Sequence, residues 1–125
     1  MDLNPVNVSF TFTNKHLFKI RPDQQYDLVW AAGLFDYLED RPAGVLLKRM
    51  WNLTKDGGQL VVGNFHPRNP NRNMMEWVGD WFLIHRTEQD FLELCHKSNI
   101  SEKSATFEQE PLGSCIFLIV KKGLT

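Results

Sequence analysis

The sequence has few cysteines, no excess of one charge and no long apolar run. Its two cysteines, Cys95 and Cys115, could form only one disulfide bond, and their apolar neighbours favour reduced, buried thiols. The 14 Lys and Arg against 15 Asp and Glu give a net charge of −1, so we expect no nucleic-acid partner. Residues 115–120 form the longest apolar run, which is too short to span a membrane. Because no basic segment followed by an apolar one begins the chain, we expect a cytoplasmic protein without a membrane partner.

Common catalytic motifs are also missing. The chain contains no GxGxxG, P-loop or GxSxG motif, and its four histidines form no HExxH and no Cys/His pair at zinc-binding spacing. We therefore expect no metal site. What the chain does have is 42% hydrophobic residues in a length of 125, which suits one core and a single domain over residues 1–125.

Hydrophobic patterning predicts strands along the whole chain. Residues 6–12 alternate apolar and polar, as in a half-buried strand. Residues 26–33 are apolar on both faces, which is typical of a central strand that helices cover on each side. A further strand is predicted at 59–65, and residues 104–110 and 115–122 should form an antiparallel pair.

Helical periodicity appears between these strands. A helix is predicted at 42–54, with Asp40 as a candidate cap, Pro42 in the first turn and the glycine pair at 57–58 at its end. A second helix is predicted at 88–98, capped at its start. Strand, helix, glycine pair and strand make a βαβ unit, so the predicted fold is α/β, a mainly parallel sheet with helices on its faces and a C-terminal antiparallel hairpin.

The run "YDLVWAAGLFDYLED", followed by "LLKRMWNLTKDGGQLVVGNF", resembles the middle of a class I S-adenosylmethionine (SAM)-dependent methyltransferase. The aromatic-Asp pair Tyr26-Asp27 and the glycine pair Gly57-Gly58 carry the match, which extends over about residues 6–122. In detail the chain looks most like bacterial methyltransferases that act on small molecules or fatty acids. The resemblance implies a partial Rossmann-like fold, SAM as cofactor and methyl transfer as the ancestral chemistry.

One departure from the family pattern concerns the cofactor. The family's first strand, its glycine-rich loop and the acidic residue that binds the ribose all belong before residue 6. The chain therefore resembles the C-terminal half of a methyltransferase, and we expect it not to be catalytically competent alone. It is a fragment of a longer enzyme, a natural truncated protein, or a chain that completes its site with another one. A non-enzymatic module that binds a small molecule or assembles as a dimer is the alternative.

The resemblance places candidate cofactor contacts after two strands. It implies that Asn14, Gly33, Leu34 and Phe35 lie near SAM. Each also has a structural explanation, because Asn14 suits a turn and residues 33–35 suit a bend packed against the core.

Candidate catalytic groups follow the strands at 26–33 and 59–65. Asp36, Tyr37 and His66 are types of side chain that orient an acceptor hydroxyl or remove its proton. A capping or solvated carboxylate and an exposed loop histidine are the structural alternatives.

A substrate pocket is predicted from Asn64 and Phe65 together with an aromatic segment over residues 74–83. This segment, interrupted at Gly79-Asp80, could form a helix over a site and line a pocket for an apolar or fatty-acid-like ligand, through Met74, Trp77 and Trp81. The alternatives to a substrate pocket are that the same residues pack in the core or form a dimer interface.

The missing strands should also leave an unpaired edge. In the family they lie between the strands that correspond to residues 6–12 and 26–33. Either these two strands pair directly, or the exposed edge recruits a second copy, and we expect a homodimer through this edge.

Overall fold

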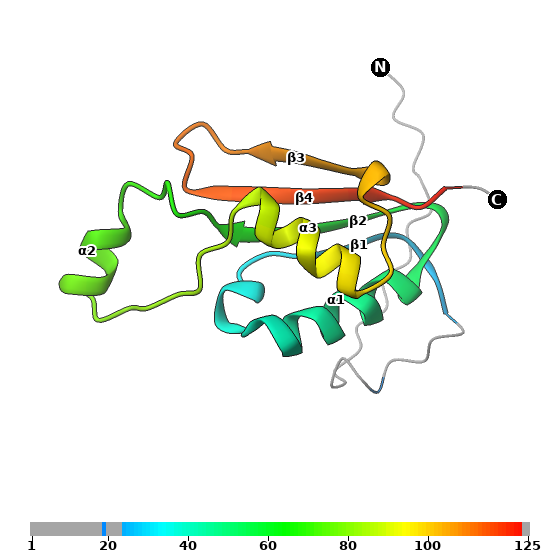
Figure 1. Cartoon of the computed structure of the whole chain (residues 1–125), viewed down its shortest axis with the longest axis horizontal. Helices are drawn as coiled ribbons and strands as arrows, with labels where there is room; N and C mark the ends of the chain where they lie inside the picture. Colours follow the sequence, from blue (N-terminus) through cyan, green and yellow to red (C-terminus); the bar gives the residue numbers. More distant parts are fainter. Residues whose placement is uncertain (1–18, 20–23, 124–125) are drawn as a thin grey trace, which may run out of the picture.

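The computed structural model describes residue 19 and residues 24–123, and within them it has a four-stranded sheet in the order β1-β2-β4-β3 (Figure 1). β1 (Tyr26–Ala31) runs parallel to β2 (Thr54–Phe65). β4 (Cys115–Lys121) is antiparallel to both β2 and β3 (Ala105–Gln109). The predicted α/β fold, its βαβ unit and its C-terminal hairpin are confirmed. The predicted strand at 6–12 lies outside the described residues.

The βαβ connection is α1 (Asp40–Leu53), two residues longer at its start than predicted. Its apolar face buries Leu46, Leu47 and Met50 against the sheet. The prediction of a cap at Asp40 is wrong, because Glu39 precedes the helix and no side chain caps it. Asp40 is the first helical residue, and its carboxylate binds Arg86 instead.

α3 (Glu88–Lys97) confirms the predicted helix at 88–98 and has a clear N-terminal signal. The Asp90 backbone N–H donates to Thr87 Oγ1 at 3.1 Å, and the Thr87 N–H donates to Asp90 Oδ2 at 2.8 Å. This reciprocal pair satisfies two backbone donors at the helix start, which typically contributes about 1 kcal/mol.

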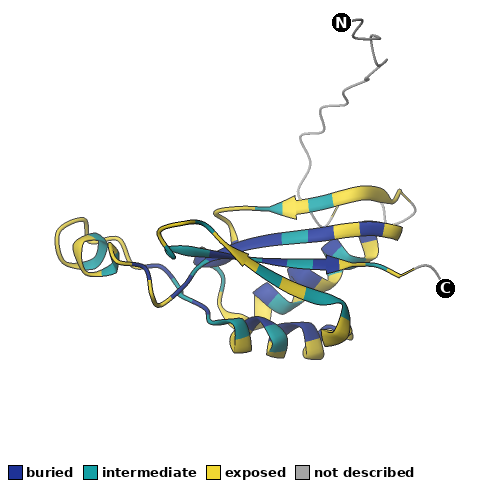
Figure 2. Ribbon diagram, turned by 90° about the horizontal axis from the view of Figure 1, so that it is seen from above, coloured by how far each residue is buried: buried dark blue, intermediate teal, exposed yellow. Residues whose placement is uncertain are grey.

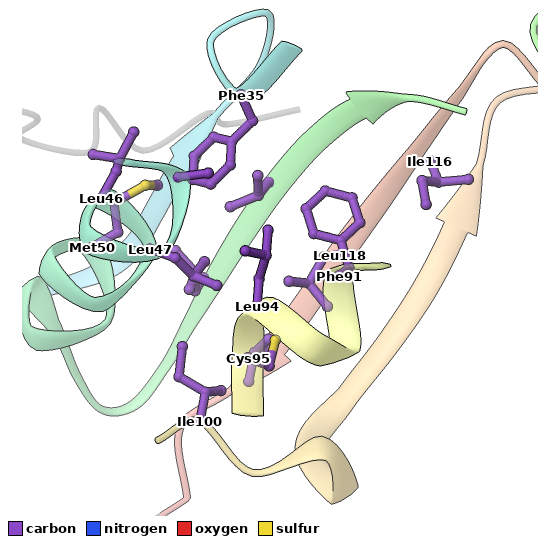
Figure 3. Packing of buried hydrophobic residues seen from close by; sticks show 14 residues of the cluster. Phe35, Leu46, Leu47, Met50, Phe91, Leu94, Cys95, Ile100, Ile116 and Leu118 are labelled. Carbon is purple, nitrogen blue, oxygen red and sulfur yellow. The ribbon is translucent and has the colours of Figure 1, made fainter. Parts of the chain in front are cut away.

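Both helices cover the same face of the sheet, and the core lies between them and the strands (Figures 1 and 3). Leu60 and Val62 of β2 and Leu118 and Val120 of β4 are fully buried there. Figure 3 shows how Phe91 and Leu94 of α3 point into this layer. Each fully buried side chain of this kind contributes about 1.5–3 kcal/mol relative to an exposed one.

The opposite face of the sheet carries no helix among residues 24–123. Leu28 is 53% exposed and Trp30 65% exposed, while their neighbours Val29 and Ala31 pack on the core side. The prediction that helices cover this strand on each side is therefore wrong for the described part of the chain. An apolar run that looked buried on both faces belongs to a strand at the edge of the sheet that residues 24–123 form.

The glycine pair does not end the helix, which stops at Leu53, four residues earlier than Gly57. Gly57 has a φ of +86°, a conformation that favours glycine, and its N–H donates to Lys122 O. A Cβ on Gly58 would lie 2.7 Å from the carbonyl oxygen of Asp27. The pair therefore lets β1 and β2 approach closely at an irregular point of their pairing.

Both cysteines have free thiols, as predicted. Cys95 is buried, and this burial raises its pKa to about 11, while Cys115 is half-buried. No helix in the described ranges is long and apolar enough to cross a membrane.

Candidate functional site

The carboxyl ends of β1 and β2 meet at one edge of the sheet, where ligands bind in many α/β proteins. After β1 the chain turns at Gly33, with a φ of +77°, into the short helix η2 (Phe35–Tyr37). This turn brings Asp36 to the end of β2, where its Oδ1 accepts from the Phe65 N–H at 2.7 Å. Asp36 is almost fully buried, and burial raises the pKa of its carboxyl above the ordinary value. The alternative of a solvated or capping Asp36 is wrong.

Arg86 lies fully buried beside Asp36, and sequence reasoning missed it. Its Nη1 donates to the Phe35 carbonyl at 2.7 Å and to Asn64 Oδ1 at 2.9 Å. Its Nη2 donates to the Leu38 carbonyl at 2.6 Å and to Asp40 Oδ1 at 3.1 Å. The guanidinium therefore joins the segment that follows β1 and the end of β2 to the start of α1. The sequence does carry a signal for this role. Arg86 closely follows the apolar residues 81–84 and stands one residue before the cap of a predicted helix.

Asn64 completes this group, which we name the strand-end cluster: Asp36, Asn64 and Arg86. Its Nδ2 donates to the carbonyls of Phe65 and Ile84, both at 2.9 Å, and its Oδ1 accepts from Arg86. Every polar atom of the amide is thus used within the chain. The cluster holds the strand ends together and leaves no polar group of Asn64 for a ligand.

His66 is buried, so the alternative of an exposed loop histidine is wrong. Its Nε2 lies 2.8 Å from Glu88 Oε1, and its Nδ1 accepts from the Arg68 backbone N–H at 3.0 Å. Both ring nitrogens are therefore engaged, and they anchor the loop after β2 to the start of α3.

The candidate cofactor contacts after β1 have different environments. Gly33 has open space around its Cα, and the Leu34 side chain is exposed. Phe35 is a fully buried core residue, and its carbonyl accepts from Arg86 and from the Leu38 N–H. Asn14 lies outside the described residues.

Residues 70–83 form an arm that extends away from the sheet and includes α2 (Arg72–Trp77) (Figures 1 and 2). Trp77 is 85% exposed, and Met74, Val78 and Phe82 are also exposed. The alternative that these residues pack in the core is therefore wrong. Trp77 and Phe82 line a hollow of about 250 Å³ together with Glu76.

Tyr37 and Trp81 connect the arm to η2. The Trp81 indole Nε1–H donates to the Tyr37 hydroxyl at 3.2 Å, and both side chains are partly exposed. Beyond the arm the chain returns to β2, and the ring centroid of His85 lies 5.9 Å from that of Phe65. The structure therefore brings Tyr37, Phe65 and Trp81 to the same end of the sheet, whereas Met74 and Trp77 lie out on the arm.

His85 is a further residue that sequence reasoning missed. Its Nδ1 lies 3.0 Å from the Leu83 carbonyl, so that nitrogen donates and Nε2 is left as an acceptor. Burial lowers the pKa of the ring below its ordinary value, which favours the neutral form. Within residues 24–123, Nε2 has no hydrogen-bond partner.

A further hollow of about 410 Å³ lies away from the strand ends. Its lining includes Gly44 and Lys48 of α1 with Lys97 and Ser98, and it contains none of the predicted site residues. Among the described residues, no group of three or more His, Cys, Asp or Glu is placed to hold a metal ion.

Comparison with known proteins gives matches to solved structures. No family model matches the sequence, and no curated protein matches it either. A "possible exported protein" from Bordetella parapertussis is 20% identical with a TM-score of 0.69, over 88% of this chain and 43% of that one. Human N-acetylserotonin methyltransferase in complex with SAM is 18% identical with a TM-score of 0.65, over 94% of this chain and 36% of the enzyme.

A third structure, magnesium protoporphyrin IX methyltransferase from Synechocystis with bound S-adenosylhomocysteine (SAH), is 15% identical. Its TM-score is 0.62, and the match covers 90% of this chain and 51% of the enzyme. The chain thus spans between a third and about half of the lengths of these three proteins. At such identities the likeness concerns the fold. The chain has the fold of one part of a SAM-dependent methyltransferase.

Proposed function

We propose that this chain is the acceptor-side part of a SAM-dependent methyltransferase fold and does not transfer methyl groups on its own. The strand-end cluster supports this proposal most directly. Methyl transfer depends on holding the donor and the acceptor in line, with a general base in some cases. In this chain Asn64, Arg86 and His66 instead direct their polar atoms to other parts of the chain.

The residues present do not make a complete SAM site. Two of the fold neighbours have SAM or SAH bound, and SAM would supply an electrophilic methyl group to the acceptor. This chain has no glycine-rich G-x-G-x-x-G stretch, and Phe35 turns its side chain into the core. Of the proposed contacts, Gly33 and Leu34 remain beside open space. We therefore expect SAM to bind only when another polypeptide segment supplies the glycine-rich part.

An apolar small molecule, fatty-acid-like in character, is the proposed acceptor. Trp77 and Phe82 offer exposed aromatic surface on the arm, next to a hollow of suitable size for a single chain or ring. Met74 adds an adaptable apolar side chain beside them. At the root of the arm, the exposed Tyr37 hydroxyl accepts from the Trp81 indole N–H and keeps its own O–H as a donor for a polar head group.

Calorimetry with SAH on the full 125-residue chain tests the cofactor part of the proposal. We expect no saturable heat and no rise in the melting temperature, whereas a ligand at a hundredfold excess over its Kd would stabilise the fold by about 2.7 kcal/mol. One-to-one binding of SAH to the chain alone would overturn the proposal that the site is incomplete.

Calorimetry with dodecanoate tests the acceptor part. We expect saturable binding that weakens about tenfold or more in Trp77→Ala, because the indole supplies the largest exposed apolar surface of the arm. Leu112→Ala, at an exposed position in the β3–β4 turn, is the matched control and should bind like the wild type. Absence of saturable binding, or equal loss in both variants, would contradict an acceptor site on the arm.

An assembly module without enzymatic activity is the second candidate function. One observation favours it, namely the apolar edge and face that β1 leaves exposed in the described part of the chain.

A further inference from the structure

β1 has a hydrogen-bonded neighbour on only one side among the described residues. It pairs with β2 from Leu28 to Ala31, and the sheet order places no described strand beyond it. A strand in this position presents a row of backbone N–H and C=O groups that can pair with another strand. Natural edge strands often carry lysine, proline or a bulge that prevents such pairing. β1 contains no lysine or proline, its one charged residue is Asp27, and the irregularity in its pairing with β2 lies before Leu28.

An apolar surface adjoins this edge. Trp30, Val61 and Ile119 lie in one row across β1, β2 and β4, and all three point to the face that α1 and α3 do not cover. Phe117 lies in the next row, where its ring covers Gly63, and a Cβ on that glycine would meet it at 2.8 Å. With Leu28, these side chains form what we name the open face: Leu28, Trp30, Val61, Phe117 and Ile119.

The sequence of β1 allows it to pair with itself. Two β1 strands related by a two-fold axis perpendicular to the sheet run antiparallel and keep their open faces on the same side. With Val29 opposite its own copy, Leu28 lies opposite Trp30 of the second copy and Asp27 lies opposite Ala31. Aromatic–aliphatic cross-strand pairs are favourable, and no like charges face each other.

A shifted register is less favourable. Moving the pairing so that Asp27 lies opposite Asp27 of the second copy would place two carboxylates side by side, which is destabilising. A slip by one residue would set the open face of one copy beside the covered face of the other. The pattern of charged and apolar residues in β1 therefore selects self-pairing centred near Val29.

From these observations we propose that two copies of this chain form a dimer by antiparallel pairing of their β1 strands, which joins the two sheets and their open faces. The occupant of the edge is a second copy because β1 matches itself in apolar pattern and, in this register, sets no like charges opposite each other. The net charge of −1 gives little repulsion between copies. The dimer goes beyond the proposed function and does not depend on SAH or acceptor binding. It also excludes any polypeptide that would complete the methyltransferase sheet from the same edge.

Sedimentation velocity over a hundredfold range of concentration tests the dimer. The wild-type chain should sediment as a dimer at the upper end and dissociate on dilution. Trp30→Lys should weaken the dimer about a hundredfold, because a central tryptophan is lost and two ammonium groups would face the opposite Leu28 side chains. Because Trp30 is 65% exposed in the single chain, this variant should retain the wild-type circular dichroism spectrum.

Two further variants make the result specific. Leu28→Glu should also yield monomers, since it places a carboxylate opposite Trp30 of the second copy. Val45→Lys changes an exposed apolar residue on the outer side of α1 and should remain dimeric. A wild-type chain that stays monomeric at all concentrations overturns the proposal. Dimers that survive both β1 substitutions, or that are lost equally in Val45→Lys, also overturn it.

Discussion

The two faces of the sheet differ in how much of their apolar surface the chain itself covers. In β4, Ile116, Leu118 and Val120 are buried under α1 and α3, whereas Phe117 and Ile119, which alternate with them, are only half-buried. The side chains on the two faces are similar in size and hydrophobicity. Among the described residues, the covered face therefore holds the fold together, and the open face carries the apolar surface that we propose for association.

The same contrast separates the strand-end cluster from the arm. Arg86 and Asn64 are buried, and their side-chain polar atoms hydrogen-bond to each other and to carbonyl groups near the end of β2. Trp77 and Phe82, only a short distance along the chain, are exposed. Substitutions in a region whose polar groups are hydrogen-bonded to one another should lower the stability of the fold. A region with exposed apolar groups can instead bind a ligand or a partner through that surface. The following predictions test this division, beginning with the largest effect.

Removing the buried guanidinium should cause the largest loss of stability. Arg86→Ala leaves Asn64 Oδ1 and the Leu38 carbonyl without their donor, and the Phe35 carbonyl keeps only the Leu38 N–H. Each unsatisfied buried group costs about 1–3 kcal/mol. We expect the free energy of unfolding in urea to fall by about 3–5 kcal/mol, as when one partner of a buried charged network is lost.

Asp40→Asn is the control for the ion pair within this network. The Asp40 side chain is 73% exposed, so its pairing with Arg86 is screened by solvent and should contribute less than about 1 kcal/mol. If both variants lost the same stability, the ion pair rather than the buried carbonyl groups would hold the strand ends together.

The second prediction compares the two faces within one strand. Leu118→Ala should cost about 2–5 kcal/mol, because it opens a cavity in the covered face, where Leu118 is fully buried. Ile119→Ala, on the open face, should cost about 1 kcal/mol or less in urea unfolding at a dilution where the chain is monomeric. Equal costs would mean that the open face is covered in the monomer, which would contradict the comparison.

Much of this fold was predictable because local signals agree with it. The capping box at Thr87 and Asp90 and the periodic apolar face of α1 gave both helices to within two residues. The hairpin of β3 and β4 followed from two strand-like segments, 104–110 and 115–122, on either side of a turn at 111–114. The exposure of Trp30 could not be predicted in this way, because an apolar strand has the same sequence whether or not a helix covers its second face.

The candidate site was less predictable, for a related reason. The residue types at the strand ends were recognised, including Asp36 and Asn64, but their roles depend on Arg86, which is 22 residues beyond Asn64 in the sequence. Whether a polar side chain faces a ligand or another part of the chain depends on such distant contacts. The exposure of Trp77 likewise depends on how the arm leaves the sheet.

The smallest expected effect concerns pH and His85, which lies where the arm rejoins the covered part of the molecule. Burial lowers the pKa of this ring in the folded state, so the unfolded chain binds a proton at a higher pH than the folded chain does. The contribution of the neutral His85 ring to the free energy of unfolding is fully present above the ordinary pKa of about 6.5. It is lost as the pH falls towards the lowered pKa. His85→Gln should therefore flatten the decline in the melting temperature just below that pH, while His96→Gln, on the exposed side of α3, controls for the loss of a histidine. If both variants kept the wild-type decline, protonation of His85 would not contribute to it, and this half-buried ring would account for no part of the pH dependence of stability.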